Sequence, residues 1–169
     1  MKALFICLSI SFVSFPFTNS INPKLGNKRP NEIHTNKDIS RDDLIKAIHS
    51  INANLSFKKG KDINSFPHFF ANEKGKFSVD IIGTENSTYS VKFIVIIDRN
   101  NNQERYLQIV ESISQLLSGS SGKTWVHKNI AQLTTLDKDF HSALPDSGYS
   151  TKLDYLSKNK LLTVDFKRQ

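Results

Sequence analysis

Two stretches of the chain carry hydrophobic residues with the spacing of an amphipathic helix. The first follows Ser40, a residue type that favours helix N-termini, and has Asp42 and Asp43 where the helix dipole favours negative charge. Its apolar residues recur at intervals of three and four, which predicts a helix from Ser40 to near Asn54. That apolar face consists of Leu44, Ala47, Ile48 and Ile51.

The second amphipathic stretch follows an Asn-rich break at 98–102. We predict that it ends at Gly119, because glycine commonly terminates helices. Its main stripe is made of Tyr106, Val110, Ile113 and Leu117, with Leu107 and Leu116 beside it. A short helix or a loop is predicted over 125–133, with Trp125, Ile130 and Leu133 turned inward.

Alternation of apolar and polar residues predicts β-strands elsewhere. The longest alternating run places Tyr89, Val91, Phe93, Val95 and Ile97 on one face. Since Ile94 and Ile96 add apolar residues to the opposite face, we expect a central strand that is covered on both sides near its end. A shorter alternation at Phe77, Val79 and Ile81 precedes it, and residues 55–70 give only weak signals of a strand and a turn at Gly60.

The C-terminal region reads as a β-hairpin. Leu153 and Tyr155 alternate before the polar segment 157–160, and Leu162, Val164 and Phe166 alternate after it. The order of helix, strands, helix and strands predicts an α+β fold, in which an antiparallel β-sheet packs one face against two main helices. No internal repeat is evident in the sequence.

The first twenty residues have the pattern of an export signal. Lys2 precedes an apolar run over 3–17, and Thr18 and Ser20 place small residues before a cut ahead of Ile21. The apolar run is about 15 residues, whereas a membrane-spanning helix needs roughly 20. We therefore expect a signal peptide over 1–20, a flexible leader over 21–37 and a single domain over 38–169, located in the periplasm or secreted.

Composition narrows the chemistry of the exported part. Cys7 is the only cysteine, so its removal with the signal excludes disulfides, thiolate catalysis and cysteine-based zinc sites. The chain has 23 basic and 16 acidic residues, and Lys2 is the only charged residue among the first twenty. The resulting net charge of +6 favours anionic surfaces. The lysines are dispersed, however, so nucleic acid is not favoured as a partner. We also expect no cofactor, and no membrane span in the mature chain.

Two patterns suggest chemistry and are weighed against simpler interpretations. The segment 118–124, SGSSGKT, ends like a phosphate-binding P-loop, but that motif requires glycine where Leu117 stands and a preceding strand rather than a helix. The densest set of metal-ligand types is Asp137, Asp139 and His141, with Asp146 just beyond. These side chains share one side only if the segment is extended, and the alternative is a solvated polar loop.

Histidines and asparagines complete the candidate residues. His68 lies among apolar residues, and His127 is close to Trp125, so these three are candidates for lining a pocket; a core or surface position is the simpler interpretation for each histidine. No nucleophile-elbow motif occurs. Asn54 and Asn86 are formal N-glycosylation acceptors, which matter only in a eukaryotic secretory route.

The middle third of the chain carries a resemblance. The run Val79-Asp80-Ile81-Ile82-Gly83, a polar turn, a long alternating strand, an Asn-rich break, a helix and then Gly122-Lys123-Thr124-Trp125 resembles a group of small exported bacterial proteins of uncharacterised function. These motifs are structural, so the resemblance implies fold and export and transfers no catalytic residue.

Three functional classes follow from the sequence. The leading expectation is an exported, non-catalytic binding or interaction domain that recognises another protein or an anionic surface. One alternative is a metal-assisted or acid/base hydrolase that uses Asp137, Asp139 and His141. The other is a basic binder of polyanions or membrane surfaces that works through its dispersed lysines and the leader residues Lys24, Lys28 and Arg29.

Overall fold

The computed structural model describes residues 38–97, 103–133, 135–144 and 148–169, which belong to one compact unit. The expected signal, leader and Asp146 lie outside the described residues. In chain order the elements are α1 (Arg41–Ile51), β1 (Lys58–Lys59), β2 (His68–Glu73), β3 (Phe77–Gly83), β4 (Thr88–Ile96), α2 (Glu104–Leu133), β5 (Phe140–Leu144), β6 (Tyr149–Leu156), the short 3-10 helix η1 (Ser157–Asn159) and β7 (Leu161–Arg168).

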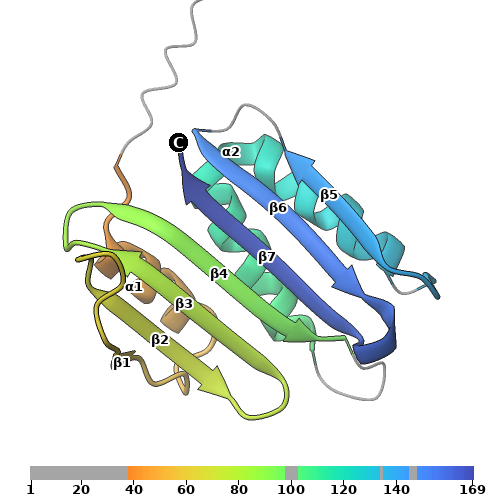
Figure 1. Cartoon of the computed structure of the whole chain (residues 1–169), viewed down its shortest axis with the longest axis horizontal. Coiled ribbons are helices and arrows are strands. Elements are labelled where there is room, and N and C mark those ends of the chain that lie inside the picture. The colour runs from red at the N-terminus through yellow and green to blue at the C-terminus, as the bar shows by residue number, and fades with distance from the viewer. Residues whose placement is uncertain (1–37, 98–102, 134, 145–147) are drawn as a thin grey trace, which may run out of the picture. The chain divides into compact units, whose positions relative to one another are not determined.

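The seven strands form one antiparallel sheet in the order β1-β2-β3-β4-β7-β6-β5 (Figure 1). The predicted α+β class and the C-terminal β6–β7 hairpin are confirmed. Each half of the domain is a helix followed by an antiparallel meander, of β2, β3 and β4 in the first half and of β5, β6 and β7 in the second, and the halves meet where β4 pairs with β7. The two halves share this topology although the sequence shows no repeat. The first half also contains the two-residue edge strand β1, which pairs with β2.

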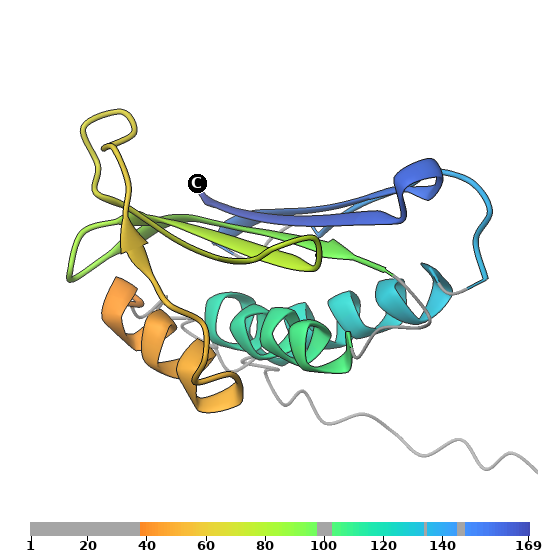
Figure 2. The ribbon, with the colours of Figure 1, turned by 90° about the horizontal axis from the view of Figure 1, so that it is seen from below.

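Both helices lie on the same face of the sheet (Figure 2). Their apolar stripes and the inward residues of the central strands form the core, in which Phe93, Phe166 and Ile113 are fully buried. The prediction that β4 is central is confirmed by its place as the fourth of seven strands. Its expected cover on both sides is not found among the described elements, because Ile94 and Ile96 point to the face without helices and are only half-buried.

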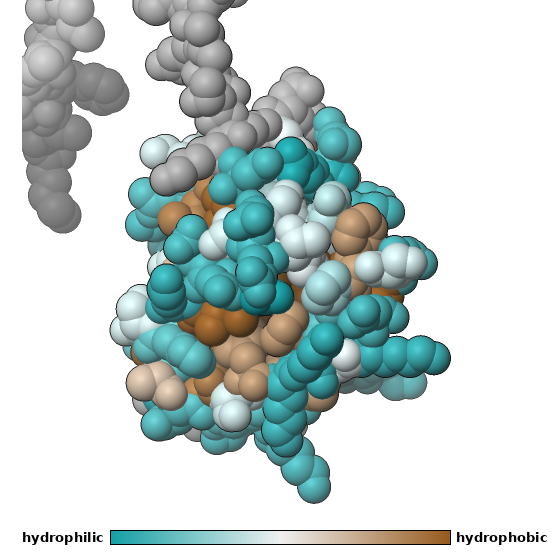
Figure 3. All heavy atoms as spheres, turned by 90° about the vertical axis from the view of Figure 1, so that its left-hand side faces the viewer, coloured by the Kyte–Doolittle hydropathy of each residue, from teal (hydrophilic) through white to brown (hydrophobic). Residues whose placement is uncertain are grey.

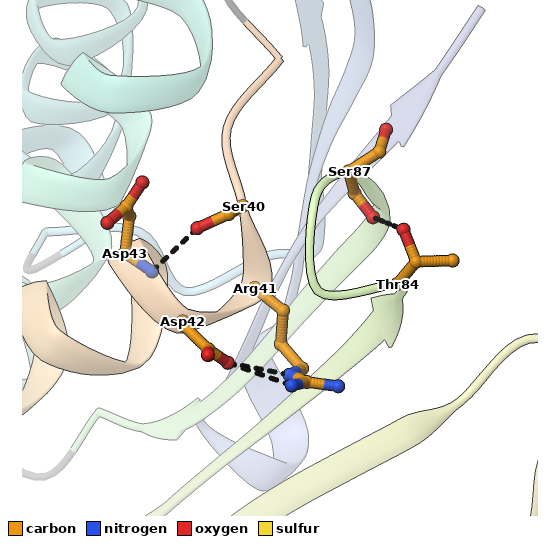
Figure 4. A network of polar contacts seen from close by, with 6 residues as sticks. All are labelled: Ser40, Arg41, Asp42, Asp43, Thr84 and Ser87. Carbon is orange, nitrogen blue, oxygen red and sulfur yellow. Dashed lines mark hydrogen bonds and ion pairs between the residues drawn. The ribbon is translucent and has the colours of Figure 1, made fainter.

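Helix α1 begins as its capping residues predict. The Ser40 hydroxyl accepts a hydrogen bond from the backbone N–H of Asp43 at 3.0 Å (Figure 4). The helix ends at Ile51, and the N–H of Asn52 still donates to the carbonyl of Ile48, so it is slightly shorter than predicted. Leu44 and Ile48 are the fully buried residues of its apolar face.

Helix α2 folds back on itself at Gly119. This residue has φ of 67° and ψ of −164°, outside the helical region. Glu111 and His127 would stand about 24 Å apart in a straight helix, yet a Glu111 carboxylate oxygen lies 2.9 Å from Nδ1 of His127. Residues 104–118 and 120–133 are therefore two helical arms, and the predicted end at Gly119 is confirmed as the end of the first arm. The second arm starts earlier than the short helix expected at 125–133.

A β-bulge between β3 and β4 changes one core assignment. Ile82 pairs with Ser90, whereas Gly83 pairs with Thr88, so the register shifts by one residue. Thr88 is consequently buried, while Tyr89 is only half-buried and packs against Phe66, with ring centroids 4.1 Å apart and ring planes tilted by 35°. The expectation that Tyr89 faces inward with the rest of the strand is wrong, because the extra residue in the bulge reverses its side.

Candidate functional site

Two hollows are lined by residues that the structure describes. The larger of these two lies at the end of the sheet beside the C-terminal arm of α2, and we name it the terminal hollow. Its volume is about 580 Å³, which is in the range of small-ligand sites. Figure 2 shows the β6–β7 connection and the end of α2 at this same end of the domain. The lining residues are Ile97, Leu133, Leu136, Asp137, Tyr155, Ser157, Lys158 and Lys160.

The floor of the terminal hollow is apolar and comes from three parts of the chain. Ile97 follows β4, Tyr155 points inward from β6, and Leu133 ends α2. All three are buried against the main core. Their side chains are only 2–5% exposed, so the floor offers a ligand a small apolar surface that the core itself holds in place.

The wall formed by η1 is anchored by Asp139. One oxygen of its carboxylate accepts hydrogen bonds from the backbone N–H of Ser157 at 2.8 Å and from the Ser157 hydroxyl at 2.9 Å. These hydrogen bonds lower the pKa of Asp139 below its usual value, the backbone hydrogen bond contributing most. The carboxylate is therefore ionised at neutral pH and holds the start of η1 to the segment before β5.

Two lysines stand at the rim of the terminal hollow, and the described residues give neither of them an ion-pair partner. Lys160 has φ of 50° and ψ of 38°, a left-handed conformation in which glycine and asparagine are the usual residues. Lys158 and Lys160 are both exposed. Asp137, which is also exposed, lines the same hollow, so the lining carries two positive charges and one negative charge beside an apolar floor.

The sequence did not identify this site. It indicated only a polar hairpin turn at 157–160, because the lining residues are spread over three distant segments. One local signal was available: a lysine occupies the last turn position, where a left-handed residue is needed and asparagine or glycine would fit with less strain.

A second hollow of about 450 Å³ lies near the N-terminus of α1 and the β3–β4 turn; it is lined by Arg41, Lys59, Pro67, Phe69, Thr84, Glu85 and Asn86. The Arg41 guanidinium is already engaged there. It pairs with Asp42 at 2.9 Å and lies 4.3 Å from the ring centre of Phe69. Figure 3, viewed from the β1–β2 side, shows apolar surface interrupted by hydrophilic side chains. Apart from Arg41, its charged lining residues are Lys59 and Glu85, which carry opposite charges.

The three candidate metal ligands have separate surroundings and do not converge on one point. Asp139 is bound to Ser157, and His141 is part of β5, where its Nδ1 lies 2.7 Å from a carboxylate oxygen of Asp154. Asp137 lines the terminal hollow. Among the residues that the structure describes, no three histidine, cysteine or acidic side chains are grouped so that they could hold a metal ion. The segment is partly a strand rather than the polar loop considered as an alternative.

The three candidate pocket residues do not meet. His68 is on β2, on the sheet face without helices, where its Nε2 lies 2.8 Å from Asp80. Trp125 and His127 are on the second arm of α2, and Trp125 packs against the core. The SGSSGKT segment spans the bend of α2 and not a strand-to-helix turn. Asn54 and Asn86, the formal glycosylation acceptors, are both exposed.

Comparison with known proteins gives no relative: no family model, no curated protein and no solved structure matches this chain. Within the described part of the chain, neither helix has the length and apolarity that crossing a membrane would require.

Proposed function

We propose that this chain is an exported, non-catalytic binding domain whose ligand is an amphipathic anion, held in the terminal hollow. The observation that carries the proposal is the presence of two unpaired lysines, Lys158 and Lys160, beside the apolar floor. A ligand with a negative group next to a hydrocarbon part matches both features. The charge of the exported part, which is positive overall, favours the approach of such a ligand.

Each half of the site makes a separate contribution to this proposal. Burying a hydrocarbon chain against the floor releases roughly 25 cal/mol for each Å² of apolar area removed from water. The rim lysines add charge-assisted contacts, which are stronger than neutral hydrogen bonds. This proposal combines two of the functional classes expected from the sequence, the binding domain and the binder of anionic surfaces. It locates ligand recognition at one end of the domain.

The test uses dodecanoate as the probe, below its micelle concentration, with isothermal titration calorimetry on the full chain. We expect dodecanoate to bind and dodecanol, which has the same chain without the charge, to bind at least tenfold more weakly. Lys158→Ala combined with Lys160→Asn removes both rim charges, and asparagine tolerates the left-handed conformation at 160. Lys74→Ala, an exposed lysine of the β2–β3 turn outside the hollow, is the matched control.

Two results would contradict the proposal. One is equal affinity for dodecanoate and dodecanol, which would remove the role of the rim charges. The other is an unchanged affinity in the double variant, which would place binding elsewhere. Export is tested separately: mass spectrometry of the protein secreted from a bacterial host should give an N-terminus at Ile21, and retention of residues 1–20 would refute cleavage.

A further inference from the structure

One face of the sheet carries no helix (Figure 2); we name it the open face, and the strand register gives it an ordered pattern of charge. Strand register places four charged residues side by side across four neighbouring strands, because Asp80 pairs with Lys92, Lys92 with Asp165, and Asp165 with Lys152. We name this set the charge row: Asp80 on β3, Lys92 on β4, Asp165 on β7 and Lys152 on β6. Its signs alternate along the whole row.

The charge row retains unused pairing capacity. Within the described residues, only Asp80 of the row has an ion-pair partner within 4 Å, the His68 ring at 2.8 Å. Lys92 and Lys152 are exposed. Neighbouring opposite charges stabilise the sheet modestly, by roughly 0.2–1 kcal/mol for each cross-strand pair, and their charges remain available to a partner.

We propose that the open face binds a second copy of this chain, through a two-fold axis parallel to the strands and between β4 and β7. Rotation about this axis places β4 over β7 of the partner and β3 over β6 of the partner. Lys92 then faces a copy of Asp165, and Asp80 faces a copy of Lys152. All four members of the charge row face an opposite charge, because the sequence of signs is inverted when it is read from the other end.

The pattern selects this axis over the other in-plane alternative. A two-fold axis along the charge row would place each residue over its own copy, and like charges would repel. With the axis parallel to the strands, two further charged residues of the open face meet uncharged ones: Lys167 faces Ser90, and Asp154 faces Ser78, as the paired registers require. Lys58, on the edge strand β1, lies beyond the last strand of the partner. Electrostatic complementarity of this kind determines register and partner choice.

An apolar strip at one end of the open face adds contact area. It consists of Ile96, Leu161 and Leu156, which are neighbours across β4, β7 and β6. Leu156 is 38% exposed, although it is a large apolar residue in a strand. The proposed rotation places Ile96 over a copy of Leu161 and Leu161 over a copy of Ile96, so the strip is also self-complementary.

The area of the interface and its charge content determine the expected affinity of the dimer. The four strands that carry the charge row, at about 4.8 Å spacing and with seven to nine residues each, present roughly 500 Å², less than the roughly 800 Å² per partner of standard interfaces. The β1–β2 connection rises above the open face beside them (Figure 2). Burying charges costs desolvation free energy, which partly offsets their attraction. We therefore expect a reversible dimer rather than a permanent one. The terminal hollow is lined from the helix side of the sheet and does not depend on this contact.

The experiment makes the charge row uniform in two variants of the full chain. Lys92→Asp with Lys152→Asp gives an all-acidic row, and Asp80→Lys with Asp165→Lys gives an all-basic row. We expect sedimentation velocity to show a concentration-dependent dimer for the wild type and at least tenfold weaker self-association for each variant. Mixing the two variants should restore dimers, because acidic and basic rows then face each other. Circular dichroism establishes that both variants are folded.

A gentler pair of variants covers the case in which a uniform row prevents folding. Lys92→Glu places like charges at the centre of the interface and should weaken the dimer, whereas Lys92→Glu with Asp165→Lys restores opposite charges and should recover it. A wild type that stays monomeric, variants that dimerise unchanged, or folded uniform variants that fail to associate on mixing would each overturn the proposal.

Discussion

Replacement of Phe93 by alanine is the sharpest test of the central strand. The side chain is fully buried on β4, and its ring centre lies 6.1 Å from that of Phe77 and 6.3 Å from that of Phe166. Phe→Ala in a core costs about 3–5 kcal/mol through lost transfer free energy and the cavity that remains. Loss of two aromatic pairs, each worth about 0.5–1.5 kcal/mol beyond area, places Phe93→Ala in the upper part of that range.

Lys92→Ala is the matched control, because Lys92 is next to Phe93 in β4 but its side chain points to the open face and is exposed. It should cost about 1 kcal/mol or less, from weakened cross-strand pairs. Urea denaturation, followed by circular dichroism at submicromolar concentration, gives both free energies of unfolding. Because domains are stable by only about 5–15 kcal/mol, a loss of about 4–5 kcal/mol should lower the urea midpoint of Phe93→Ala by between about a third and nearly all of its wild-type value. Equal and small effects in the two variants would refute the assigned register and the sheet built on it.

Two further predictions concern the helical layer. Gly119→Ala should destabilise the domain by roughly 1–3 kcal/mol in urea denaturation, because its φ and ψ belong to a region that only glycine adopts readily, while the space around its Cβ is open; an unchanged midpoint would refute the bend in α2. For Tyr106, burial and a hydrogen bond to Glu73 raise the pKa to about 12. The stabilisation from the protonated hydroxyl should be complete below pH 10 and lost as pH rises toward 12. Between pH 8 and pH 11 the free energy of unfolding of Tyr106→Phe should therefore fall by roughly 1 kcal/mol less than that of the wild type. Equal falls in the two proteins would contradict a stabilising role of the Tyr106 hydroxyl.

The elements with long, regular patterns were predictable, and the short edge elements were not. Helix α1, β4 and the β6–β7 hairpin each bury one complete face, so their periodicity is visible in the sequence. Strand β5 has only one strand neighbour and half-buried inward residues, and β1 has two exposed residues. Without a buried face, neither strand leaves a pattern. The Tyr89 error has a different cause, since a bulge changes register without changing the alternation of the sequence.

The terminal hollow could not be predicted because it depends on tertiary contact. Its apolar floor consists of residues that the sequence correctly suggests are core, such as Leu133 and Tyr155. They line a hollow because the end of α2 and the β6–β7 connection meet beside them, and this meeting depends on how far the second arm of α2 extends after it turns at Gly119. No local pattern encodes that distance.

The charge row illustrates a stronger form of the same limit. Asp80, Lys92, Lys152 and Asp165 are ordinary polar positions of four alternating strands. They form one row because the register of three strand pairs places them opposite each other. A shift by one residue in any pair would move one strand's charges to the buried face. Burial therefore fixes only the face: the apolar residues of each strand must face the helices, so the charges between them lie on the open face. Their alignment in one row depends on the register itself, because a shift by two residues would keep the same face buried and separate the charges.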